Sequence, residues 1–167
     1  MISIRKIRET DSESFLRLCK KLDEETQFMM LESGERKISI EEQTKTIKQI
    51  LQRNNQMIFI AESETELVGY VSAFGGDFKR NRHCAHIIIG ILQAFGSQGI
   101  GKKLFSELEQ WAKQIGIHRL ELTVMYHNER AINLYKKMGF EIECIKKDSL
   151  LVNEKYVDEF YMAKLLS

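Results

Sequence analysis

A glycine-rich stretch near the middle of the chain has the residue types of a phosphate-binding site. It reads Gly-Ser-Gln-Gly-Ile-Gly-Lys over residues 96–102 and follows an apolar, β-branched run over residues 85–92. This order predicts a strand that leads through a turn into a helix. Free N–H groups at a helix N-terminus attract anions, and glycines allow a phosphate to come close to the backbone. The pattern therefore predicts a diphosphate site, and the alternative is an ordinary turn with solvated lysines.

Two nucleotide-binding motifs are close to this stretch, and neither matches it. Residues 96–102 fit the letters GxxxxGK of a P-loop, but Lys103 stands where Ser or Thr must hold Mg²⁺. The dinucleotide fingerprint GxGxxG fails because Leu104 occupies the place of its last glycine. A nucleotide hydrolase and a dinucleotide-binding protein are therefore disfavoured.

A second stretch with chemical potential follows further along the chain. It reads Asn-Glu-Arg-Ala-Ile-Asn-Leu-Tyr-Lys-Lys-Met-Gly-Phe over residues 128–140. Ala131, Tyr135 and Met138 are spaced by four and by three, so they share one face of a predicted helix. Tyr135 in this place is either a packed aromatic side chain or a phenol that can donate a proton.

Together, the two stretches resemble the GNAT superfamily of N-acetyltransferases. In that family the turn after a central strand typically reads Arg/Gln-x-x-Gly-x-Gly/Ala and binds the diphosphate of acetyl-coenzyme A (acetyl-CoA). Here the glycines match, but Gly96 stands where the family has Arg or Gln, so that Gln98 or Lys102 would have to supply the missing contact. The family's later Asn-x-x-Ala…Tyr-x-x-x-Gly-Phe segment is matched by Asn128, Ala131, Tyr135, Gly139 and Phe140.

The resemblance implies direct transfer of an acetyl group from acetyl-CoA, as cosubstrate, to a primary amine of a small molecule or peptide, without a metal. The pantetheine would lie along a strand edge, and an N–H of Ile91 or Leu92 would support the oxyanion. Tyr135 is the expected general acid toward the leaving thiolate. The residues expected to bind the cosubstrate are Ile91, Leu92, Gln93, Gly96, Ser97, Gln98, Gly99, Ile100, Gly101, Lys102, Asn128 and Tyr135.

The general base is less constrained by the sequence. A lysine-like amine has a pKa of about 10.4, so another group must accept its proton before it can attack. The strand before the turn lacks the glutamate that the family often carries, and its candidates are His83 and His86, of which we expect His86. Glu25, Glu32 and Asp158 are alternatives, and so is a chain of water molecules.

The acceptor is constrained only by charge. Acidic residues outnumber basic ones after the first predicted helix, in a region that usually walls the acceptor pocket of the family. This excess would favour a cationic acceptor such as a polyamine, an aminoglycoside or a peptide amine, or it is a solvated helix rim. The alternative to an enzyme is a non-catalytic acyl-CoA-binding or regulatory module, since Gly96 and the missing glutamate both depart from the family pattern.

Hydrophobic periodicity predicts the elements that position these residues. Strands are expected near residues 2–7, 57–61, 67–74, 85–92, 118–124, 140–151 and 156–165. Helices are expected from Asp11 or Ser12, from Ser39, over 100–115 and over 129–138. The apolar run over 85–92 predicts a strand covered on both faces. This order predicts one α/β (α+β) domain over residues 1–167, with a mixed, mostly antiparallel sheet of about seven strands and about four helices.

The composition is typical of a soluble domain. The chain has 167 residues, 43% of them hydrophobic and 29% charged, and a formal charge of +1. This balance predicts no nucleic-acid or membrane partner and leaves a homodimer open. No apolar run approaches the ~20 residues of a membrane helix, and the start does not resemble a signal peptide, so we expect a cytoplasmic protein. The three cysteines form no CxxC pair, which disfavours a zinc ribbon or a disulfide scaffold.

Overall fold

The computed structural model describes residues 1–167 and has the predicted order of elements. The strands are β1 (Ser3–Lys6), β2 (Gln56–Glu62), β3 (Leu67–Gly75), β4 (Cys84–Ile91), β5 (Arg119–Met125), β6 (Glu141–Val152) and β7 (Lys155–Leu165). The α-helices are α1 (Ser12–Glu25), α2 (Ile40–Gln52), α3 (Ile100–Ile115) and α4 (Glu129–Lys137). The predicted α/β fold class is confirmed.

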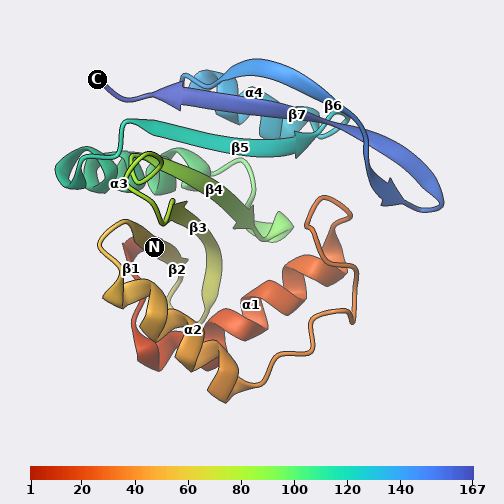
Figure 1. Cartoon of the computed structure of the whole chain (residues 1–167). Helices are drawn as coiled ribbons and strands as arrows, with labels where there is room; N and C mark the ends of the chain where they lie inside the picture. Colours follow the sequence, from red (N-terminus) through yellow and green to blue (C-terminus); the bar gives the residue numbers. More distant parts are fainter.

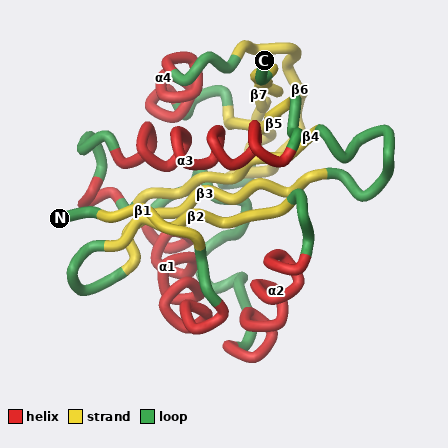
Figure 2. Tube along the Cα trace, turned by 90° about the vertical axis from the view of Figure 1, so that its left-hand side faces the viewer, coloured by secondary structure: helices red, strands yellow, loops and turns green.

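All seven strands form one sheet in the order β1-β2-β3-β4-β5-β7-β6. Only the β4–β5 pair is parallel, so the prediction of a mixed, mostly antiparallel sheet is confirmed. Helices cover both faces of the sheet (Figures 1 and 2), with α1 and α2 on one face and α3 on the other. The long β6–β7 hairpin extends away from the body of the molecule (Figure 1).

The helices form where their capping residues and apolar spacing require. Ser39 accepts a hydrogen bond from the Glu42 N–H at 3.1 Å and so caps α2 as predicted. Asp11 stands at the N-cap of α1, but its carboxylate binds the Arg5 guanidinium at 2.8 Å instead of the helix amides. The apolar face of α1, which includes Phe15, Leu18, Cys19 and Leu22, is buried in the core.

The prediction that β4 is covered on both faces is wrong. Its side chains alternate between buried Ala85 and Ile87 and the more accessible His86 and Ile88, the last of which is 40% exposed. The strand is apolar along its length because its accessible face borders an apolar cleft, not a second layer of helices. Apolar composition alone does not separate these two environments.

The strands β4 and β5 separate partway along their length. They pair only at Cys84–Arg119, Ala85–Leu120 and His86–Glu121. Each strand keeps its other neighbour beyond that point, because β3 pairs with β4 as far as Ile91 and β7 pairs with β5 as far as Met125. Figure 1 shows the two strands diverging toward their C-terminal ends. The sheet therefore opens between them, with unpaired backbone along both edges.

A buried ion pair anchors the segment between α1 and α2, which carries several residues of this opening. The Arg36 Nε lies 2.7 Å from Asp23 Oδ2, and Arg36 Nη2 lies 3.2 Å from Asp23 Oδ1. The side chain of Asp23 is only 1% exposed. Phe28, Met29 and Met30 follow α1 in this segment and line the cleft.

Replacement of Arg36 by Ala should lower the free energy of unfolding by about 3 kcal/mol, because it leaves a buried carboxylate without its partner. Urea denaturation measures this change. Arg17→Ala is the matched control, since Arg17 forms an exposed pair with Glu13 at 3.5 Å and its loss should change stability little. Equal stability of the two variants would contradict the assigned role of the Asp23–Arg36 pair.

Candidate functional site

A cleft of about 1170 Å³ lies where β4 and β5 separate. It is lined by residues of β4, β5, α1, the segment after α1, the N-terminus of α3 and the length of α4. The predicted site residues that line it are His86, Ile91, Leu92, Gln93, Gly96, Ser97, Gly99, Ile100, Gly101, Lys102, Asn128 and Tyr135. Gln98 is the only predicted site residue that does not line the cleft. The two motifs, far apart in sequence, therefore meet in one cavity.

Six successive backbone amides, those of residues 97–102, have no hydrogen-bond acceptor within the protein. The first intrahelical bond of α3 is donated by the Lys103 N–H to the Gly99 carbonyl at 3.1 Å. Ser97 and Gly99 have positive φ angles of 62° and 76°, and left-handed residues in such a turn make successive N–H groups line a concave surface. Together with the helix N-terminus, this surface is suited to a group with several anionic oxygens.

Gly101 allows α4 to pack closely against this turn. A Cβ atom at residue 101 would lie 2.7 Å from Leu134 Cδ2 and 3.4 Å from Ile91 Cδ1. A larger side chain would push α4 and β4 away from the turn, although the outer end of Leu134 can give way to a small one. The glycine therefore fixes the width of the cleft at its phosphate end.

Gly101→Val should weaken coenzyme A binding about 10- to 100-fold, because overpacking of this order costs about 1–3 kcal/mol and displaces the turn. Titration calorimetry measures the effect. The double variant Gly101→Val/Leu134→Ala restores the space and should recover much of the affinity. Full affinity in Gly101→Val alone would contradict the assignment of this turn as the diphosphate site.

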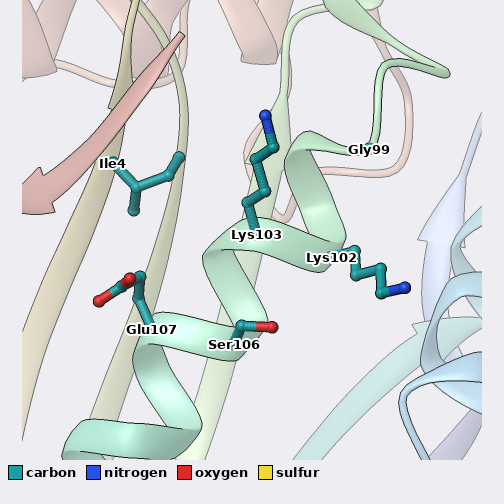
Figure 3. A pocket seen from close by; sticks show the side chains of 6 residues that line it. All are labelled: Ile4, Gly99, Lys102, Lys103, Ser106 and Glu107. Atoms are coloured by element: carbon teal, nitrogen blue, oxygen red, sulfur yellow. The ribbon is translucent and has the colours of Figure 1, made fainter.

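The cations near the turn differ in what they face. Lys102, Arg130 and Lys137 line the cleft, and none of them forms an ion pair. Lys102 and Lys103 diverge from the first turn of α3 (Figure 3). Lys103 lines a second depression with Ile4, Ser106 and Glu107, and this depression shares Gly99 and Lys102 with the cleft. The cleft thus has positive charge without an ion-pair partner beside its free amides. Lys103 does not line the cleft.

The strand edge supplies one of the two predicted oxyanion donors. The Leu92 N–H donates to the Val68 carbonyl at 2.9 Å and is therefore not free. Since bonded positions alternate along an antiparallel ladder, the amides of Ile89 and Ile91 point away from β3, toward the space that β5 has left. The Gln93 N–H is also occupied, because it donates to Glu25 Oε1 at 2.7 Å. Ile91 is thus the predicted donor that is available.

Tyr135 lies at the meeting point of α3, α4 and the cleft. Its ring packs edge-on against Phe105, with centroids 5.9 Å apart and an interplanar angle of 84°. Burial raises the pKa of Tyr135 well above its ordinary value of 10. Its hydroxyl has no hydrogen-bond partner in the protein. It is not among the fully buried side-chain atoms that lack a partner, which are Asn55 Oδ1 and His127 Nδ1. The phenol is therefore protonated at neutral pH and open to the cleft.

Asn128 shapes the same region through the backbone. Its Oδ1 accepts a hydrogen bond from the Ala131 N–H at 3.4 Å and so caps α4. Asn128 also lines the cleft, and its amide group keeps donors that the cap does not use.

His86 lines the cleft from β4 and is half-buried. Burial lowers its pKa from the ordinary value of 6.5, with a smaller lowering from Lys146 and opposing effects from Glu121 and Glu159. The imidazole is therefore neutral at pH 7 and able to accept a proton. Its alternative His83 precedes β4 and does not line the cleft.

Among the acidic alternatives, the structure brings only Glu25 to the cleft. Glu32 and Asp158 do not line it, and the Asp158 carboxylate accepts from the Asp148 N–H at 2.8 Å. The structure also brings Glu159 to the cleft, a residue that was not predicted as a base. This carboxylate is 5% exposed, accepts from Ser149 Oγ at 2.9 Å and lines the cleft. The only indication in the sequence is that Glu159 follows Asp158 on a predicted strand, so the two side chains point to opposite faces of the sheet.

No group of three or more His, Cys, Asp or Glu side chains is placed to hold a metal ion. No helix combines the length and the apolar character required to cross a membrane.

Comparison with known proteins shows which family and which relatives this chain resembles. The model of the acetyltransferase (GNAT) family matches residues 17–140, which include β4, the glycine-rich turn and α4. L-amino acid N-acetyltransferase AaaT of Escherichia coli (strain K12) is 34% identical over 107 residues. That match covers 64% of this chain and 66% of the relative, so it spans just under two thirds of the relative's own length.

Solved structures share the whole fold. The acetyltransferase of the GNAT family from Streptococcus pneumoniae superposes with a TM-score of 0.96 at 28% identity, and 100% of each chain is covered. The yncA protein of Salmonella typhimurium, solved with its cofactor acetyl-CoA, has a TM-score of 0.88 at 17% identity. That match covers 99% of this chain and 94% of the other, and at this identity it shows the fold alone.

Proposed function

The chain belongs to the acetyltransferase (GNAT) family, and we propose that it transfers an acetyl group directly from acetyl-CoA to a primary amine. The observation that carries this proposal is the run of six unpaired amides, residues 97–102, at one end of a cleft that also contains Tyr135 and His86. These amides fit a diphosphate, and the free edge of β4 beyond them fits an extended pantetheine.

Bound acetyl-CoA supplies the acetyl group as a thioester, so that a C–N bond forms as the C–S bond breaks. The amides of residues 97–102 hold the diphosphate and set the depth of the thioester in the cleft. The Ile91 N–H donates to the carbonyl oxygen as negative charge develops there. Tyr135 donates its phenolic proton to the departing sulfur, and His86 accepts the proton that the amine loses. The products are the acetamide and free coenzyme A.

The carboxylates that line the cleft suggest the acceptor. The three cations that line the cleft belong to α3 and α4, whereas the carboxylates that line it are Glu25 and Glu159. Met29 and Leu150 add apolar surface. This combination supports a cationic amine with an apolar neighbour as the acceptor.

Acetyl-CoA should be consumed in the presence of at least one amine from a panel of diamines, polyamines, aminoglycosides, free L-amino acids and short peptides. Release of free thiol measures turnover, and mass spectrometry identifies the acetylated product. The L-amino acids are included because the relative AaaT is named for them. Tight coenzyme A binding without turnover on any amine would contradict the enzyme and favour a non-catalytic acyl-CoA-binding module.

The pH dependence of kcat/KM should report His86. Since its pKa is lowered, the imidazole remains neutral, and competent as a base, until the pH falls below 6.5. The acid limb of the profile should therefore have its midpoint below 6.5. His86→Gln should lower the rate and remove that limb. An unchanged limb in the variant would show that another group, such as Glu159, accepts the proton.

A further inference from the structure

We propose that Arg130, in the first turn of α4, supplies the positive side chain that Gly96 cannot offer to the diphosphate turn. The diphosphate of the cosubstrate would then be held from two sides, by the amides that precede and begin α3 and by the guanidinium from α4. This inference rests on the proposed function, and it assigns a binding role to a residue outside the glycine-rich turn.

The position of the Arg130 guanidinium carries the inference. Its Nη2 donates to Ser97 Oγ at 2.9 Å. A Cβ atom at residue 96 would lie 2.9 Å from both Cζ and Nη1 of Arg130 and would overlap its Nη2. The guanidinium therefore occupies the space that any side chain at residue 96 would need. A cation is present at this point of the turn, but it comes from another helix.

Arg130 has unused binding capacity. A guanidinium has five N–H donors, and Arg130 makes one hydrogen bond, to a neutral hydroxyl, and no ion pair. It lines the cleft together with Gly96, Ser97 and Gly99. A planar guanidinium with free donors, next to free amides and without a carboxylate partner, is suited to bidentate binding of phosphate oxygens.

The packing of α4 against α3 keeps Arg130 in this position. Gly101 and Leu134 are in close contact at the interface of the two helices, one turn further along α4 than Arg130. The expected substitutes in the turn are less suited to the role. Gln98 does not line the cleft, and the Lys102 ammonium lacks the planar fork by which a guanidinium binds two oxygens in parallel. Because Gly96 has no side chain, it leaves the space that the Arg130 guanidinium occupies.

Titration calorimetry with coenzyme A and with 3′-dephospho-coenzyme A tests the proposal without requiring turnover. Arg130→Ala should weaken both ligands about 10- to 100-fold, the effect of losing charge-assisted hydrogen bonds. Lys113→Ala is the matched control, since Lys113 lies in the last turn of α3, at the other end of the helix from the glycine-rich turn, and does not line the cleft; it should leave both affinities unchanged. A loss confined to coenzyme A would overturn the proposal, because Arg130 would then bind the 3′-phosphate.

A coupled pair of variants tests the shared space. Gly96→Ala should weaken binding in the wild-type background, because its Cβ displaces the guanidinium, but should have no further effect in Arg130→Ala. Gly96→Arg combined with Arg130→Ala should recover affinity by returning the cation to the turn. Additive effects of Gly96→Ala and Arg130→Ala would overturn the proposal.

The failure of this inference differs from the failure of the proposed function. Equal coenzyme A affinity in the wild type and Arg130→Ala would overturn the inference alone. Absence of coenzyme A binding by the wild type would overturn the proposed function and the inference together.

Discussion

Replacement of Tyr135 by Phe should lower kcat by about 10²–10⁴-fold, the range for loss of a positioned general acid. The variant keeps the ring that packs against Phe105 and loses only the hydroxyl, which has no partner in the protein. Binding of coenzyme A should therefore weaken much less than kcat falls, and the free energy of unfolding should be unchanged. Steady-state release of free thiol, with saturating amine, measures kcat.

Tyr70→Phe is the matched control for this prediction. Tyr70 is also buried, and burial also raises its pKa, but it lies on β3 and does not line the cleft. Its kcat should remain that of the wild type. If Tyr135→Phe kept full kcat as well, the leaving thiolate would have to take its proton from water, and the assigned role of Tyr135 would be wrong.

Ile91→Pro should lower kcat by about 10²–10³-fold, the effect of removing one oxyanion donor. Proline removes the N–H of residue 91, which faces the opening, while the ladder bonds of β4 to β3 come from the alternate residues and remain. Ile91→Val keeps the N–H and should retain most of kcat.

Two measurements separate the lost donor from a general disturbance of the strand. Thermal unfolding of Ile91→Pro should remain a single cooperative transition, and its binding of coenzyme A should weaken much less than kcat falls. A rate close to wild type in the folded variant would show that another donor, such as Ile89, supports the oxyanion.

The sequence predicted those features of the fold and site that depend on local signals. The start of α2 after Ser39 and the end of α3 at residue 115 are each set by neighbouring residues, and Gly116 ends α3 in the left-handed conformation. The two motifs were recognisable because their residues lie within short segments. The pairing of these segments across the cleft followed from the family resemblance, since no local pattern encodes it.

The remaining features depend on contacts between distant segments. The exclusion of the Leu92 amide follows from its register with Val68, which an apolar run cannot reveal. Glu159 reaches the cleft through the pairing of β7 with β5 and β6, whose register is shifted by irregularities in β6. The contact of Arg130 with Ser97 spans 33 residues of chain. At Gly96 the sequence therefore indicated a missing side chain, whereas the structure places another residue in that space.

The location of the diphosphate tests the central claim most directly. A crystal structure of the complex with coenzyme A should show diphosphate oxygens about 2.7–3.2 Å from amide nitrogens of residues 97–102, the range of an N–H···O hydrogen bond. The sulfur should then lie in the cleft between Ile91 and Tyr135. A diphosphate bound elsewhere, with these amides facing only solvent, would contradict the account.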